Sequence, residues 1–251
     1  MGGATTIYAL SNGLRLDGAV LIDPLLNTRD ALKQGGWIAY GLPPGVFQLV
    51  AGRASEIAEE FQINPKCRKV TFTGSTEVGQ HLIRGAADGI KPLSLELGGH
   101  SPVLVFDDAD LDKAVEGTLI AKFRNTGQSC IAANRIYIQS GIHDRFVTAF
   151  VDKVRAMKTG YSLEDGVEIG AMIDETALQQ ALDHIEEAKS RGATLHCGGT
   201  RLENSPGTFL LPTVLTEVPE DVTGMCDETF GPVAYINKFD TIDDGISQAN
   251  D

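Results

Sequence analysis

The sequence predicts an α/β protein built on parallel sheets, because short apolar segments alternate with amphipathic helical segments along most of the chain. The chain has 251 residues, of which 42% are hydrophobic, enough for one large domain or two smaller ones. The alternation begins at Gly41 and continues to the last residue. The first forty residues show no such order, apart from an apolar run at 19–26.

The first alternating set extends from Gly41 to Gly99. Ser55 is a plausible N-cap for the first helix of this set. In the second helix, Val78, Leu82 and Ile83 are expected on one face. The expected strands are 46–50, 68–74 and 92–99, and the expected helices are 55–63 and 75–87.

A second set follows Gly99 and repeats the alternation. In its first helix, Leu111, Ala114, Val115 and Leu119 recur at helical spacing, which predicts a face turned to the core. The expected strands are 102–106, 135–139, 193–197 and 233–239, and the expected helices are 110–123, 142–157, 174–192 and 243–251.

Charge and cysteine content exclude several function classes. The formal net charge of −13 disfavours binding to nucleic acid or to an anionic membrane, which requires clustered Lys and Arg. No apolar run has the length of a bilayer span. The four cysteines (Cys67, Cys130, Cys197 and Cys226) are widely spaced and form no CxxC pair, so neither a disulfide framework nor a metal site is expected. A reducing, cytoplasmic compartment is the expected setting.

Two motifs lie at expected strand ends in the first set. In 74-GSTEVG-79 the start of a helix follows a glycine, an arrangement that can bind a phosphate but is also an ordinary capped turn. In 95-LELGG-99, Glu96 lies where α/β sheets bind ligands. A partly buried Glu96 could act as a general base, and an exposed strand-end glutamate is the alternative.

Two more motifs lie in the second set. In 124-RNTGQSC-130, Cys130 has Arg124 on one side and Arg135 on the other, and positive charge favours the nucleophilic thiolate. The alternative is a small buried apolar residue, the common fate of a single cysteine. In 227-DETFGPVA-234, an acidic residue before Phe-Gly-Pro could accept hydrogen bonds from ribose hydroxyls or belong to a solvated turn.

Taken together, the four motifs resemble one family, the aldehyde dehydrogenases. The segments that carry the resemblance are 72-FTGSTEVG-79, 95-LELGG-99, 123-FRNTGQSC-130 and 228-ETFGPV-233. The sequence around Cys130 is most similar to that of the succinate-semialdehyde dehydrogenase branch. The resemblance implies a partial Rossmann-like cofactor domain at 41–98, then a partial α/β catalytic domain at 99–251 of the aldehyde dehydrogenase fold. Residues 1–40 remain unassigned.

The resemblance also implies a reaction and its residues. Cys130 would add to an aldehyde, here succinate semialdehyde, and pass through a thiohemiacetal and a thioester. Glu96 would activate the water that releases the acid. Arg124 would bind the far carboxylate of the substrate, which suits a planar guanidinium. The cofactor would be NAD or NADP, held by Gly74 and Ser75 at its diphosphate, Glu228 at the nicotinamide ribose, and Leu97, Gly98 and Phe230 near the nicotinamide.

The chain also departs from the family pattern. Full members are about twice the length of a domain-sized chain such as this one. Ahead of Gly41, the expected Pro-Trp-Asn segment and the expected strand ending in Lys-Pro are absent, and Trp37 lies in Gly-Gly-Trp-Ile instead. The opening strands of the nucleotide sheet are therefore expected to be absent or replaced, and the strand that joins family members into homo-oligomers is expected to be missing. These departures keep a second hypothesis open, that the chain is a non-catalytic remnant of such an enzyme. The choice between NAD and NADP also stays open, because the residues that would select one of them are expected in the missing segment.

Overall fold

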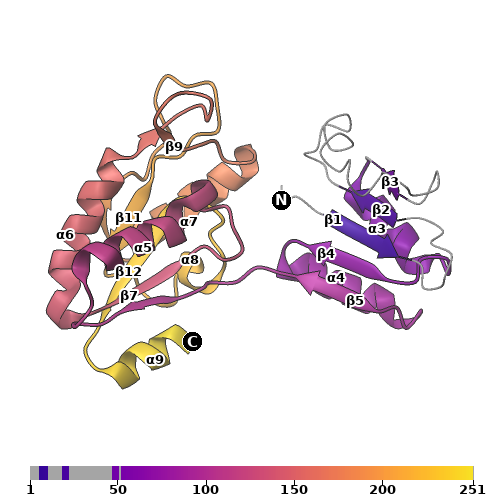
Figure 1. Cartoon of the computed structure of the whole chain (residues 1–251), viewed down its shortest axis with the longest axis horizontal. Coiled ribbons are helices and arrows are strands. Elements are labelled where there is room, and N and C mark those ends of the chain that lie inside the picture. The colour runs from indigo at the N-terminus through magenta and orange to yellow at the C-terminus, as the bar shows by residue number, and fades with distance from the viewer. Residues whose placement is uncertain (1–5, 11–18, 23–46, 51, 251) are drawn as a thin grey trace. The chain divides into compact units, whose positions relative to one another are not determined.

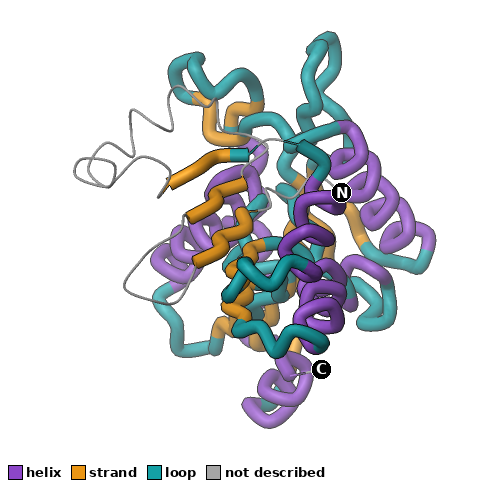
Figure 2. Tube along the Cα trace, turned by 90° about the vertical axis from the view of Figure 1, so that its right-hand side faces the viewer, coloured by secondary structure: helices purple, strands orange, loops and turns teal. Residues whose placement is uncertain are grey.

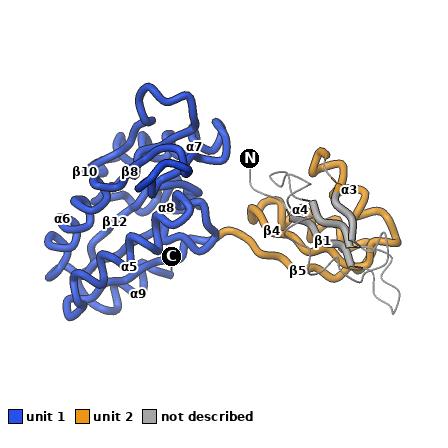
Figure 3. Tube along the Cα trace, turned by 45° about the horizontal axis from the view of Figure 1, so that its top comes forward, with its two compact units in different colours: residues 1–2, 99–251 blue, residues 3–98 orange. Residues whose placement is uncertain are grey.

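A computed structural model describes residues 6–10, 19–22, 47–50 and 52–250. The chain divides into two compact units, which meet in sequence between Gly98 and Gly99 (Figure 3). Trp37 and Gly41, on which two of the sequence expectations rest, lie outside the described residues. Each unit has its own sheet, and Figures 1 and 2 mark the helices and strands of both.

The N-terminal unit contains a five-stranded mixed sheet. Its order is β3-β2-β1-β4-β5. Strands β2 and β3 are parallel, as are β4 and β5, but β1 is antiparallel to both of its neighbours. The first forty residues thus supply two strands, and the antiparallel β1 makes this sheet mixed. The strands are β1 Thr6–Leu10, β2 Ala19–Ile22, β3 Phe47–Leu49, β4 Val70–Thr73 and β5 Leu93–Glu96.

Two helices, α3 (Ala54–Ile63) and α4 (Thr76–Ala87), pack against β4 and β5 around a buried core of Ala58, Val70, Phe72 and Leu82. The N-cap of α3 is Arg53, not Ser55, because the helix begins one residue before Ser55. Leu82 is buried as expected, whereas 49% of Ile83 is exposed. Val78 and Leu82 are four residues apart and share a face, and Ile83 falls beside it.

The second unit contains a five-stranded sheet of order β10-β11-β12-β7-β6. Its strands are parallel except β10, which pairs antiparallel with β11 at one edge. A separate parallel pair is formed by β8 and β9. The strands are β6 Val103–Val105, β7 Arg135–Gln139, β8 Lys158–Thr159, β9 Val167–Ile169, β10 Thr194–Cys197, β11 Thr213–Thr216 and β12 Val233–Phe239.

Helices cover both faces of this sheet (Figure 1). Alternation along β7 sends Ile136 and Ile138 into the core under α5 and α6, and Tyr137 into the core under α7 and α8. The result is a three-layer α/β/α unit, in agreement with the predicted fold class. The helices are α5 Leu111–Phe123, α6 Ser140–Ala156, α7 Glu175–Ser190, α8 Thr223–Cys226 and α9 Ile242–Asn250.

Candidate active site

In the N-terminal unit, the glycine motif and the glutamate motif lie side by side. Thr73 pairs with Glu96 in the sheet, and the Gly74 N–H donates to the Glu96 carbonyl at 3.0 Å. A Cβ on Gly74 would lie 2.4 Å from the Phe72 ring, so the turn requires glycine. Because parallel strands β4 and β5 end together here, both motifs occupy the sheet edge where α/β proteins bind ligands.

Ser75 caps helix α4. Its hydroxyl oxygen accepts from the Val78 N–H at 3.3 Å, as the capped-turn interpretation predicts. One cap bond satisfies only one of the first-turn N–H groups, so the helix end also keeps donors for an anion. Both interpretations of this motif are therefore compatible with the geometry.

Glu96 is exposed, which is one of the two alternatives that the sequence leaves open. The reason is alternation along β5, since Leu93 and Leu95 face the helices and Ser94 and Glu96 face away from them. Leu97 turns back and packs on α4, where a Cβ on Gly79 would lie 2.7 Å from its side chain. The sheet edge thus presents the Glu96 carboxylate to solvent beside Gly74 and Ser75.

In the second unit, the cysteine motif forms a tight left-handed loop after α5. Asn125, Thr126 and Gly127 have φ values of 54°, 60° and 71°. Left-handed backbone is unfavourable for non-glycine residues, and two of them in succession persist only where the surroundings fix them. Arg124 begins this turn and Cys130 follows it, and both side chains are exposed. Cys130 is therefore not a small buried apolar residue.

Polar contacts hold the left-handed loop in place. The Asn125 amide donates to the Gln128 carbonyl at 2.8 Å. The Thr126 hydroxyl accepts from the Gly170 N–H at 2.9 Å. Gln128 donates to the Ala171 carbonyl at 3.1 Å and accepts from the N–H of Ile173 at 2.8 Å. The segment after β9 thus fixes the loop that carries Cys130.

Gly127 also joins the cysteine motif to the Phe-Gly-Pro motif. A Cβ on Gly127 would lie 2.2 Å from the Gly231 carbonyl oxygen. Beside this contact, Phe230 is 40% exposed, while Thr229 is buried. His184 bonds Thr229 at 2.8 Å, and Thr229 bonds the Tyr235 hydroxyl at 3.1 Å. The turn is therefore anchored in the core, so the solvated-turn interpretation is wrong.

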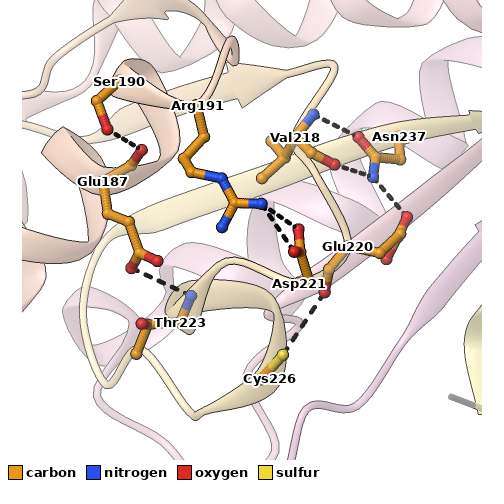
Figure 4. A network of polar contacts seen from close by, with 9 residues as sticks. All are labelled: Glu187, Ser190, Arg191, Val218, Glu220, Asp221, Thr223, Cys226 and Asn237. Atoms are coloured by element: carbon orange, nitrogen blue, oxygen red, sulfur yellow. Dashed lines mark hydrogen bonds and ion pairs between the residues drawn. The ribbon is translucent and has the colours of Figure 1, made fainter.

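A polar network anchors the segment that leads to Glu228 (Figure 4). Arg191 binds both carboxylate oxygens of Asp221 at 2.7 Å, and the Glu187 carboxylate accepts from the Thr223 N–H at 3.1 Å. Asn237 donates to the Val218 carbonyl at 2.7 Å and to Glu220 at 2.6 Å. These bonds connect α7 and β12 to the chain just before the motif and limit where Glu228 can lie.

Arg135 does not play the role suggested by its place in the sequence. It lies on β7, is 7% exposed, and donates to the carbonyls of Gln248 and Ala249 at the end of α9. The cation that the sequence does not single out is Lys122, whose side chain is wholly buried and donates to Asn134 Oδ1 at 3.0 Å. Lys122 continues the helical spacing of Val115 and Leu119, which could have placed it on the inner face.

Burial governs the charges near the cysteine loop. It lowers the pKa of Lys122 to about 7, and the negative charge of Glu228 opposes that change. Burial also raises the pKa of Glu228, while the Gly99 N–H and the Lys122 ammonium oppose that rise. Each charge therefore stabilises the charged form of the other, although burial is the larger cause for both.

Replacing Gly127 with alanine is expected to destabilise the unit by ~2–3 kcal/mol, because a left-handed backbone and a backbone carbonyl both oppose a Cβ there. Thermal and urea unfolding measure this change. Gly117, exposed within α5 and with open space around its Cβ position, is the control. Its replacement with alanine is expected to stabilise by ~0.5–1 kcal/mol. Equal effects of the two changes would contradict the proposed close approach.

Among the described residues, no group of His, Cys, Asp and Glu side chains has the arrangement of a metal site. No helix in the part of the chain that the structure describes is long and apolar enough to cross a membrane.

Comparison with known proteins agrees with the motifs. Succinate-semialdehyde dehydrogenase [NADP(+)] GabD of Escherichia coli is 48% identical over 214 residues, which are 85% of this chain and 44% of that protein. Glutarate-semialdehyde dehydrogenase of Pseudomonas aeruginosa is 47% identical over 84% of this chain and 44% of its own. A crystal structure of an E. coli NADP-dependent enzyme superposes with a TM-score of 0.87 at 45% identity, covering 92% of this chain and 48% of its own.

The chain thus spans somewhat less than half the length of these relatives. Residues 35–251 match the aldehyde dehydrogenase family over most of the chain. On this match and on the shared fold, the chain belongs to the aldehyde dehydrogenase family.

Proposed function

We propose that this protein oxidises a small aldehyde that carries a carboxylate, with succinate semialdehyde as the substrate, to the corresponding acid. The observation that carries the proposal is the exposed Cys130 on a rigid loop that closes on the Phe-Gly-Pro turn beside Glu228. The relatives named for succinate and glutarate semialdehydes support this substrate class.

Cys130 is the proposed nucleophile. Its thiolate sulfur forms a bond to the aldehyde carbon and gives a thiohemiacetal, and the backbone N–H of Cys130 stabilises the oxyanion. Loss of a hydride from that carbon leaves a thioester on Cys130. The exposed carboxylate of Glu96 then takes a proton from water, the hydroxide adds to the thioester, and the carbon–sulfur bond breaks to release the acid.

The residues of this chain fit a nicotinamide dinucleotide, NAD or NADP, which supplies the hydride acceptor when it is bound. The fit rests on Glu228 Oε1, a buried oxygen without a hydrogen-bond partner among the described residues, which can accept from a ribose hydroxyl. Gly74 and Ser75 would hold the diphosphate at the start of α4. Leu97, Gly98 and Phe230 would lie against the nicotinamide end.

Arg124 is proposed to bind the substrate carboxylate. Arg124→Met is expected to raise the KM for succinate semialdehyde about 10- to 100-fold, the loss of one charged hydrogen-bonded pair. Steady-state kinetics with an uncharged aldehyde of the same length should show little change. Arg145, exposed on α6, is the control for the loss of a surface arginine. Equal losses with both aldehydes would assign Arg124 a structural role.

The proposal is tested by following reduced nicotinamide formation by the purified protein with succinate semialdehyde, with NAD and NADP supplied separately. Turnover with release of free succinate supports it. Formation of acyl-CoA on addition of CoA would show that CoA, and not water, accepts the acyl group of the thioester. That result would contradict the assignment of Glu96 as the base that activates water. No turnover from a cooperatively folded protein would favour a chain that has lost the activity. We also propose a reducing, cytoplasmic setting, which the four free cysteines support.

A further inference from the structure

A buried polar cluster lies beneath the loop that carries Cys130. Lys122 is the penultimate residue of α5 and Asn134 directly precedes β7, so their hydrogen bond of 3.0 Å joins the two ends of the loop. Neither side chain is accessible beyond 1% of its surface. The bond between the Ala133 N–H and the Ala121 carbonyl at 3.0 Å closes the same base. Lys122 thus lies directly under the loop without reaching solvent.

The hydrogen-bonding capacity of this cluster is not used up. Within the described residues, the Lys122 ammonium makes one hydrogen bond although it has three donors. Asn134 Nδ2, Glu228 Oε1 and His100 Nδ1 are buried and have no partner there. His100 belongs to the same cluster, because its carbonyl accepts from the Asn134 N–H at 2.9 Å. The His100 ring also bonds the Cys226 carbonyl at 3.0 Å, two residues before Glu228, so the cluster adjoins the segment that carries the buried Glu228 oxygen.

We propose that Lys122 is a positioning residue: its buried ammonium, bonded to Asn134 at the base of the Cys130 loop, is the counter-cation that holds Glu228 ionised and oriented toward the cofactor ribose. The role of Glu228 in this inference rests on the proposed function. The attraction between the charges of Lys122 and Glu228 does not depend on that function. Lys122 and Glu228 make no direct ion pair among the described residues, so the attraction acts at longer range.

The directions in which the pKa values of Lys122 and Glu228 are shifted support an attraction between the two charges. The charges of Lys122 and Glu228 each oppose the effect of burial on the other. The other titratable groups that face the cluster are His100 before β6, Arg135 on β7 and Asp227 beside Glu228. Burial lowers the pKa of His100, against the opposing effect of its bond to the Cys226 carbonyl, and Arg135 and Lys122 lower it further, so the neutral form is favoured and His100 does not replace Lys122 as a cation.

The first test is a titration of the Glu228 carboxyl carbon by NMR, with its resonance assigned by loss in Glu228→Gln. Lys122→Met removes the cation while keeping the length of the side chain, and the Glu228 titration should move to higher pH because a group that lowers its pKa is gone. Lys122→Gln keeps a donor for Asn134 without the charge and should cause the same shift. Lys113→Met, on the exposed face of α5, should cause none. An unchanged Glu228 titration in both Lys122 variants would overturn the proposal.

The second test is a double-mutant cycle on cofactor binding, followed by nicotinamide fluorescence. Lys122→Met should raise the Kd about tenfold when Glu228 is present and by less than about twofold in the Glu228→Gln background. Equal weakening in both backgrounds would assign Lys122 a general structural role and overturn the proposal. Thermal unfolding serves as a check on folding, because Lys122→Met leaves Asn134 and Glu228 without their cation and removal of one partner of a buried charge pair lowers stability.

The two tests separate this inference from the proposed function. If Glu228→Gln leaves the cofactor Kd unchanged, the assignment of Glu228 to the ribose fails, whereas the titration still decides whether Lys122 is its counter-cation. If the titration fails to move while Glu228→Gln weakens binding, the proposed function stands and the role of Lys122 falls.

Discussion

Replacing Cys130 with alanine is expected to abolish aldehyde oxidation, with a loss in kcat on the order of 10³ or more. Without the sulfur there is no thiohemiacetal, and the carbon that gives up the hydride is never made tetrahedral. The loop itself should persist, because its contacts run through Thr126, Gln128 and the backbone and not through the thiol, which is exposed. Reduced nicotinamide formation measures the loss, and cofactor binding should be unchanged.

Cys67 supplies the matched control for this change. It is a half-buried cysteine in the N-terminal unit, and burial raises the pKa of its thiol, which disfavours the nucleophilic form. Cys67→Ala should leave turnover within about twofold of the unmodified protein, since Cys67 belongs to none of the four motifs proposed to form the site. Turnover that survives Cys130→Ala, or is lost equally in Cys67→Ala, would remove the chemical basis of the proposed function.

Replacing Glu96 with glutamine is expected to separate the two halves of the reaction. The amide keeps the shape of the side chain but cannot take a proton from water, so the thioester on Cys130 forms and then accumulates. Rapid-mixing experiments should show one equivalent of reduced nicotinamide per protein in a fast phase. Steady-state turnover should then be about 10²–10⁴ times slower than in the unmodified protein.

Glu59, exposed on α3, is the control for loss of an acidic surface charge in the same unit. Glu59→Gln should leave both phases unchanged. A Glu96→Gln variant that loses the fast phase as well would show that Glu96 acts before the thioester forms, for example in activating the thiol.

Local sequence patterns were sufficient for most of the elements in this chain. Helices α4, α5 and α7 begin where Ser75, Asp110 and Asp174 offer side-chain caps, and their apolar faces follow helical spacing. Strand β11 was missed because Thr213–Thr216 is short, carries a threonine at each end and is buried throughout, so that it shows no alternation. Strand β1 was missed because its place depends on pairing with β4, which is remote in sequence.

The site was predictable only where a local motif carries it. Cys130, Glu96 and Glu228 lie in short motifs, whereas the contact between Gly127 and Gly231 joins segments about a hundred residues apart. The left-handed backbone at Asn125 and Thr126 is fixed by the segment after β9, which the local sequence does not reveal. Arg135 shows that a local motif can also mislead. Its nearness to Cys130 in sequence suggests a charged partner for the thiol, but β7 directs the Arg135 side chain to the end of α9.

The measurement that tests the central claim most directly is peptide mapping by mass spectrometry of the Glu96→Gln variant after incubation with succinate semialdehyde and NAD or NADP. The proposed mechanism predicts one succinyl group, attached to the peptide that contains Cys130, and only when the cofactor is present. A succinyl group on another residue would contradict it, as would reduced nicotinamide formation without any acylation of Cys130.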